Sequence, residues 1–219
     1  SNLCNLRCQM CGPTCSSEWA RHLGKEEIYK TVDPETLTIS PDAKRIYLAG
    51  GEPFMIKSFS KLLTELENKD CEVVINTNAT ILTEHMLKAL EPFTNLCLVL
   101  SIDGVKETIE HIRTLCNWET ILKNIEILRQ RLNPNFMVNT VLQKDNLDNV
   151  PELAEWIEEQ NISKWHTTIL DKPKQYRFEN YEGKLNWPES IWQFDCVKKN
   201  IQVVKSLKYI SNYFKESNE

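Results

Sequence analysis

Five short apolar segments alternate with helical patterns along this chain, and the alternation restricts its fold more than any other feature. The segments RIYLAG, CEVVINTN, NLCLVLSID, NFMVNTVLQ and WHTTIL include consecutive apolar residues, as expected of strands covered on both faces. Apolar residues recur at helical spacing in 58–69, 117–132 and 148–161. Strand–helix alternation predicts βα units, and therefore an α/β fold with a parallel sheet, open or closed.

The last fifty residues break this alternation. Residues 171–188 are rich in aromatic and charged side chains and are expected to be irregular, and a helix is predicted from Pro188 onward. The aromatic residues here could line a substrate mouth, or they could pack the terminal helix onto the sheet: Tyr176, Phe178, Tyr181, Trp187 and Trp192.

Composition narrows the class of protein. The 219 residues carry a net charge of −5, so no overall field attracts nucleic acid or an anionic membrane, and neither is an expected partner. No run of about 18 apolar residues predicts a membrane span, and no secretory signal is visible. Four of the eight cysteines lie within residues 4–15. Such clustering indicates metal binding in a reducing cytoplasm rather than disulfides.

Three of these cysteines, Cys4, Cys8 and Cys11, form a Cys-x3-Cys-x2-Cys run. Three thiolates on one short loop can hold three irons of a cubane cluster and leave the fourth iron open to a small molecule. Cys15 could instead complete a closed four-thiolate site, which would hold structural zinc or a fully ligated redox cluster. The cysteines alone leave these alternatives open.

Polar motifs follow three of the predicted strands. AGGEPF (49–54) pairs two glycines, which allow close backbone approach, with a carboxylate and a proline. NTNAT (76–80) and SIDG (101–104) place amides, hydroxyls and a carboxylate at strand ends, although such residues also cap helices. No strand precedes the cysteine loop, whereas functional loops of parallel α/β proteins follow strands. We therefore expect that the first strand is missing and that the chain is a fragment.

In this order, CNLRCQMC, GGEP, NTNAT and SIDG resemble the radical S-adenosylmethionine (SAM) superfamily over residues 1–170. The longer string LCNLRCQMCGPTCSSEW is similar to members that carry a SPASM or twitch domain. The resemblance implies a partial (β/α)6 TIM-like barrel of parallel strands, with the first strand missing. Residues 1–170 would be the radical SAM core, and 171–219 a C-terminal extension with an irregular segment and a helix.

The resemblance also implies roles for individual residues. Cys4, Cys8 and Cys11 would ligate a [4Fe-4S] cluster. Arg113 would pair with the SAM carboxylate, although a solvated cation at a helix end is an equal alternative. Further cofactor contacts would come from strand ends: Gly50, Gly51, Glu52 and Pro53 at the amino group, Asn76 and Asn78 on the neighbouring rim, Ser101 and Asp103 at ribose or carboxylate, and Val141 beside adenine.

The implied activity is reductive cleavage of SAM to a 5′-deoxyadenosyl radical that abstracts hydrogen from a substrate, by analogy a peptide or protein. A flavodoxin or ferredoxin would supply the electron. Two alternatives stay open: a non-catalytic iron–sulfur or zinc module that uses Cys15 as fourth ligand, and a protein that binds SAM without turnover.

Overall fold

The computed structural model describes residues 1–28 and 37–216. The chain divides into two compact units. The first consists of Ser1–Leu100 and Arg113–Phe136, and the second consists of Ser101–Ile112 and Met137–Glu219.

The main sheet has five strands, in the order β2-β3-β4-β6-β7. Parallel pairing joins β2 to β3, β3 to β4, and β6 to β7. The predicted α/β class with parallel strands is therefore confirmed, and each of the five apolar segments contains one strand. The strands are β2 (Arg45–Leu48), β3 (Glu72–Thr77), β4 (Leu96–Ser101), β6 (Asn135–Leu142) and β7 (Lys164–Ile169).

A second, two-stranded ladder pairs β1 (Arg7–Cys8) with β5 (Arg113–Thr114) in antiparallel register. Among residues 1–28 and 37–44, which the structure describes, β1 is the only strand. The segment that carries the cysteines therefore pairs outside the main sheet.

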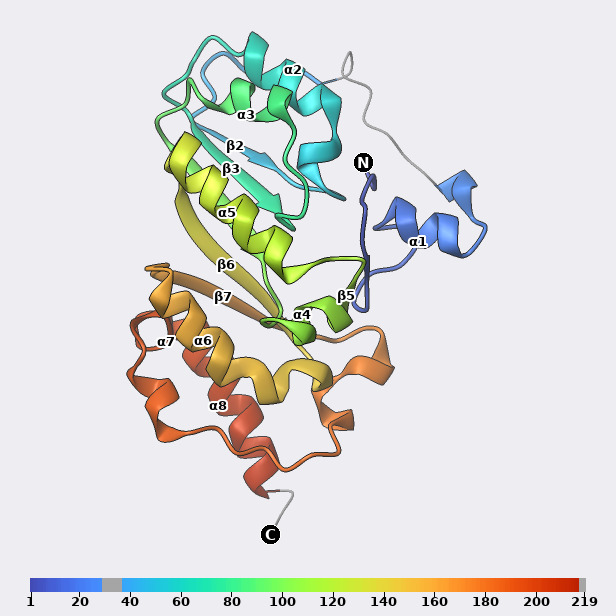
Figure 1. Cartoon of the computed structure of the whole chain (residues 1–219), viewed down its shortest axis with the longest axis vertical. Helices are drawn as coiled ribbons and strands as arrows, with labels where there is room; N and C mark the ends of the chain where they lie inside the picture. The colour runs from blue at the N-terminus through green and yellow to red at the C-terminus, as the bar shows by residue number, and fades with distance from the viewer. Residues whose placement is uncertain (29–36, 217–219) are drawn as a thin grey trace. The chain divides into compact units, whose positions relative to one another are not determined.

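Helices of the first unit cover one face of its strands. Figure 1 shows α2 and α3 side by side over β2 and β3. Alternate strand residues, such as Val73 and Ile75 of β3, point into the shared core, because successive side chains of a strand point to opposite faces. The helical segments of this unit are α1 (Ser17–His22), η1 (Glu26–Ile28), η3 (Pro53–Met55), α2 (Lys57–Glu65), α3 (Glu84–Leu90) and α5 (Trp118–Leu132).

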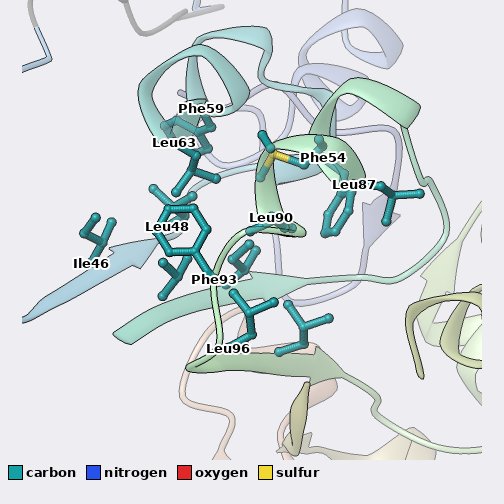
Figure 2. Packing of buried hydrophobic residues seen from close by; sticks show 14 of the residues in the cluster. Ile46, Leu48, Phe54, Phe59, Leu63, Leu87, Leu90, Phe93 and Leu96 are labelled. Carbon is teal, nitrogen blue, oxygen red and sulfur yellow. The ribbon is translucent and has the colours of Figure 1, made fainter. Parts of the chain in front are cut away.

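Figure 2 shows how this core is filled. Phe54, Phe59 and Phe93 bring aromatic rings between the helices and the strands, and Leu63 and Leu90 are fully buried among them. Burying a side chain of this size stabilises the fold by about 1.5–3 kcal/mol. The core therefore fixes the ends of β2 and β3, and with them the start of the loops that follow these strands.

In the second unit, helices pack around β6 and β7, and α8 and α7 contact β7 directly (Figure 1). The predicted helix 148–161 is present as η4 followed by α6. The helical segments are α4 (Glu107–Ile112), η4 (Lys144–Asn149), α6 (Val150–Glu159), η5 (Lys174–Tyr176), η6 (Phe178–Asn180), η7 (Glu189–Gln193), α7 (Asp195–Lys198) and α8 (Ile201–Glu216).

We predicted one helix from Pro188 onward, but the structure has three helical segments there, η7, α7 and α8. Phe194 is extended, with ψ 135°, and separates η7 from α7. The Glu158 carboxylate accepts hydrogen bonds from the backbone N–H groups of Asp195 (3.2 Å) and Cys196 (3.1 Å). An anion that satisfies the free N–H groups of a first turn favours a new helix start at this point.

The aromatic segment packs against the terminal helix. The Phe178 ring lies edge-to-face with three rings of α8, those of Tyr209, Tyr213 and Phe214, at centroid distances of 5.2–6.2 Å. Tyr181 packs on Phe214 in the same way. This arrangement supports the packing interpretation of these two aromatic residues. Across the described residues, no helix combines the length and hydropathy that a membrane span requires.

Candidate cofactor site

The three cysteines of the predicted cluster lie on a loop whose backbone is hydrogen-bonded to side chains of α1 and of its N-cap residue. The Ser17 hydroxyl accepts from Cys4 N and donates to Cys4 O, each at 3.0 Å. Ser16 Oγ donates to Leu6 O (2.6 Å), and Trp19 Nε1 donates to Cys8 O (2.9 Å). The string SSEW therefore satisfies the loop carbonyls, and the loop is held in shape by the residues that follow it.

Burial and charge act differently on the thiols. Desolvation raises the pKa of Cys4 to about 11. A hydrogen bond with the Cys8 side chain lowers the pKa of Cys11. Cys8 is buried, Cys4 and Cys11 are partly buried, and Cys15 is exposed. Three thiols of unequal environment therefore share one small region, and a metal would be needed to hold all three as thiolates.

Within the described part of the chain, no three His, Cys, Asp or Glu side chains converge as they would around one metal ion. Three cysteines of a cubane bind three different irons, so they are spread wider than the ligands of a single ion.

The GGEP loop lies directly against the residues that precede Cys4. Gly51 N donates to Ser1 O (3.0 Å), and Glu52 N donates to Leu3 O (2.6 Å). A Cβ atom on Gly51 would stand 2.0 Å from the Leu3 carbonyl oxygen, and Gly50 has φ +127°. The absence of a side chain at Gly51 thus permits a close backbone approach to the chain itself, and the approach to a ligand stays a prediction.

Glu52 is the central link of this region. Its fully buried carboxylate accepts from Thr77 Oγ1 (2.8 Å), Asn78 N (2.7 Å) and Phe54 N (3.1 Å). Burial outweighs these three donors and raises the pKa of Glu52 to about 7. Glu52 therefore ties the loop after β2 to the end of β3, and buried Pro53 then starts η3.

The NTNAT segment is also hydrogen-bonded to the cysteine loop. Asn78 Nδ2 donates to Asn5 Oδ1 (3.1 Å), and Asn5 Nδ2 donates to Thr80 Oγ1 (2.8 Å). Asn5 lies between two of the cysteines, so Asn78 supports the loop. Asn76 differs, because its Oδ1 atom is buried and has no hydrogen-bond partner among the described residues.

These atoms suit the cofactors that the resemblance implies. Within the described residues, the carbonyl oxygens of Gly50 and Gly51 accept no hydrogen bond, so they are acceptors available to an amino group. The buried Oδ1 of Asn76 is a further acceptor. Three thiols and a set of unused acceptors belong to the same unit, which fits a cluster with a bound amino acid moiety.

Arg113 is buried, unlike a solvated cation at a helix end. It is 9% exposed, and its partner across the β1–β5 ladder is Cys8. Arg113 Nη1 stands 3.7 Å from Cys8 Sγ. Its burial rules out the alternative of a solvated helix-end cation.

The remaining predicted residues belong to the second unit. Asp103 is fully buried, and its Oδ1 accepts from Val141 N at 2.7 Å. Asn146 Nδ2 donates to the carbonyl oxygens of both residues, at 2.8 Å each. Ser101 is buried at the end of β4. The structure thus brings Asp103 and Val141 together through a side-chain contact to the strand backbone.

Sequence reasoning missed the residues that hold the cysteine loop: Asn5, Ser16, Ser17 and Trp19. All four stand within or next to the cysteine motif. The signal was their side-chain chemistry, since hydroxyl, amide and indole N–H groups beside a loop can satisfy its free backbone groups. The pairing of Arg113 with Cys8 had no local signal, because 105 positions separate the two residues.

The chain resembles several known proteins. It is 30% identical over 193 residues to the AdoMet-dependent heme synthase of Methanosarcina barkeri, over 84% of this chain and 54% of that protein. The chain spans about half the length of the curated relatives that it matches.

Two solved structures share the fold. Native anSMEcpe with bound AdoMet gives a TM-score of 0.57 at 18% identity, over 79% of this chain and 50% of that one. Streptococcus suis SuiB bound to the precursor peptide SuiA gives 0.55 at 16% identity, over 100% and 45%.

The sequence model of the Radical SAM superfamily matches residues 1–157, which is most of the chain. This match confirms the predicted superfamily, which is a superfamily of enzymes whose members bind two cofactors, a [4Fe-4S] cluster and SAM. The chain belongs to the radical SAM superfamily.

Proposed function

We propose that this chain is the cofactor-binding part of an enzyme that cleaves SAM reductively and acts on a peptide or protein. Cys4, Cys8 and Cys11 would hold the [4Fe-4S] cluster. When both cofactors are bound, an electron from the cluster cleaves SAM to methionine and a 5′-deoxyadenosyl radical, which abstracts hydrogen from the substrate. Flavodoxin or ferredoxin is the proposed reductant.

One observation carries the proposal: the GGEP loop is hydrogen-bonded to the residues that directly precede Cys4. The bonds Gly51 N to Ser1 O and Glu52 N to Leu3 O fix the glycine carbonyls relative to the thiols. A SAM molecule must contact the open iron and the amino-group acceptors at once. A fixed spacing between these two groups reduces the ordering cost of binding.

Some residues of the chain are proposed to contact SAM, and others hold the loops that carry those contacts. The carbonyl oxygens of Gly50 and Gly51 would accept from the SAM amino group, with Asn76 Oδ1 as a further acceptor. Glu52 and Asn78 hold the loops, as their hydrogen bonds indicate. In the second unit, Ser101, Asp103 and Val141 are the proposed contacts for ribose and adenine.

The substrate class and the division of the chain are also proposals. The SSEW string favours the SPASM/twitch group, and the SuiB structure that shares this fold was solved with a precursor peptide. Residues 1–170 remain the proposed core and 171–219 the proposed extension. The clustering of four cysteines within residues 4–15 supports the proposal of a cytoplasmic, reducing compartment.

Anaerobic reconstitution with iron and sulfide, then dithionite and SAM, tests the activity. We expect about four irons per chain and formation of 5′-deoxyadenosine. Cys8→Ala should abolish both, whereas Cys97→Ala, a partly buried thiol on β4, should change neither. A chain with a full cluster that yields no 5′-deoxyadenosine would refute turnover and support SAM binding alone.

Cys15→Ser separates the open cluster from the closed four-thiolate site. The Cys15 thiol is exposed and lies 3.8 Å from Thr14 Oγ1. We expect this variant to keep its iron content and its SAM cleavage. Loss of both, or recovery of zinc in place of iron, would favour the closed site.

A further inference from the structure

Arg113 is the only buried Lys or Arg side chain among the residues that the structure describes. Taking a guanidinium out of water costs several kcal/mol unless charged or polar groups compensate. The second strand of the β1–β5 ladder contains only two residues, and one of them is Arg113. Because β5 pairs with β1 of the cysteine loop, this pairing sets the backbone position of Arg113.

The guanidinium reaches sulfur. Arg113 Nη1 lies 3.7 Å from Cys8 Sγ, within the range of an N–H donor to a sulfur acceptor, and both residues are buried. Backbone pairing of Cys8 with Arg113 holds the two side chains together. The contact therefore has a structural cause and does not depend on a mobile surface side chain.

The charge on Arg113 does not depend on pH. An arginine keeps its proton at any accessible pH, so the charge is permanent.

We propose that Arg113 is a positioning residue that donates a hydrogen bond to the Cys8 thiolate and raises the reduction potential of the cluster held by this loop. This inference rests on the proposed cluster site. It differs from the predicted pairing of Arg113 with the SAM carboxylate, because it acts before SAM binds.

The physical reason is the change of charge on reduction. One electron converts the cluster from [4Fe-4S]2+ to [4Fe-4S]1+, with no bond broken and no proton taken up. Reduction makes the cluster and its thiolates more negative, and hydrogen bonds to the sulfurs are among the determinants of the potential. A fixed cation beside Cys8 stabilises the reduced form more than the oxidised form.

The test is a redox titration of the reconstituted chain without SAM, followed by EPR of the reduced cluster. Arg113→Gln removes the charge and should shift the midpoint to a more negative potential, with iron and sulfide content unchanged. Arg113→Lys keeps the charge but loses the planar guanidinium group with its fixed donors. Its midpoint potential should fall between those of the wild type and Arg113→Gln.

Arg7→Gln is the matched control. It removes the same charge from β1, one position from Cys8, but Arg7 Nη1 contacts His22 Nδ1 at 2.5 Å rather than a sulfur. Its shift should be clearly smaller than that of Arg113→Gln. Equal shifts in the two variants would show an effect of net charge alone and would overturn the proposal.

Two further results would overturn the proposed role of Arg113. A wild-type midpoint in Arg113→Gln with weakened SAM binding would assign Arg113 to the carboxylate and overturn the inference. If Arg113→Gln holds no cluster, a wild-type midpoint in Arg113→Lys overturns it. Failure to form 5′-deoxyadenosine would refute the proposed function instead, because the midpoint is measured without SAM.

Discussion

The cysteine loop and the aromatic segment of residues 171–194 both lack long regular structure, but they differ in what holds them. The loop is held by hydrogen bonds, whereas the segment adds aromatic packing to hydrogen bonds such as that from Trp187 Nε1 to Leu147 O. Around the cysteine loop, three hydrogen bonds determine the backbone path: Ser17 Oγ donates to Cys4 O, Glu52 N donates to Leu3 O, and Asn78 Nδ2 donates to Asn5 Oδ1. In the second unit, ring contacts to Phe178 hold the segment against α8. Hydrogen bonds fix direction, whereas apolar packing is non-directional. The comparison suggests that geometry matters most at the loop and burial matters most at the segment.

The largest effect is expected from Gly51→Ala. The added methyl would stand 2.0 Å from the Leu3 carbonyl oxygen and 2.4 Å from its carbon, so Leu3 must move and Cys4 with it. We expect near-complete loss of reconstituted iron, measured by iron analysis and by absorption of the cluster.

Gly12→Ala is the control for that change. Gly12 follows Cys11, and a Cβ atom there would meet nothing within 4 Å. Its iron content should match the wild type. Equal iron content in Gly51→Ala would show that the loop tolerates displacement, and the contrast with the aromatic segment would fail.

Phe178→Ala tests the other side of the comparison. Phe178 is 2% exposed and contacts three rings of α8. Its removal should lower the free energy of unfolding by about 3–5 kcal/mol, as measured by denaturant titration. Folded protein should still reconstitute its cluster, and an unchanged midpoint of unfolding would contradict the assigned packing role.

Glu52→Gln should remove a pH dependence of stability. The pKa of Glu52 is raised from 4.5 to about 7 by burial, so folding favours the protonated form. The stabilisation is complete below about pH 4.5 and is lost as pH rises through 7, by about 3 kcal/mol in total.

Denaturant titrations between pH 5 and pH 8 provide the measurement, and the difference between wild type and Glu52→Gln should change over this range. Glu65→Gln makes the same chemical change at a side chain that is 64% exposed, and it should preserve the wild-type slope. Parallel curves for wild type and Glu52→Gln would show that Glu52 does not titrate in this range.

The smallest effect is expected from Ser17→Ala. Loss of its two hydrogen bonds to Cys4 should cost about 1–3 kcal/mol, because both Cys4 backbone groups lose their partner. We expect slower or incomplete reconstitution together with lower stability. Ser60→Ala removes an equally buried hydroxyl that bonds Lys57 O within α2, and it should leave reconstitution unchanged.

Local patterns predicted several elements well. Helix α5 begins after Asn117, whose side chain accepts from Thr120 N, close to the predicted start at 117. Helical breaks were not predictable in the same way. The division near Phe194 depends on Glu158, which lies 37 positions from Asp195, so no short-range pattern contains it.

The amino-acid sequence by itself determined the α/β class, the three thiols on one loop, and the family. These depend on local periodicity and on the order of short motifs, which a chain carries wherever it folds. Only the tertiary structure decided that Gly51 approaches Leu3, that Asn78 supports Asn5, and that Arg113 faces Cys8. Such contacts join residues that are distant in sequence, and they form only when the core sets the strand ends side by side.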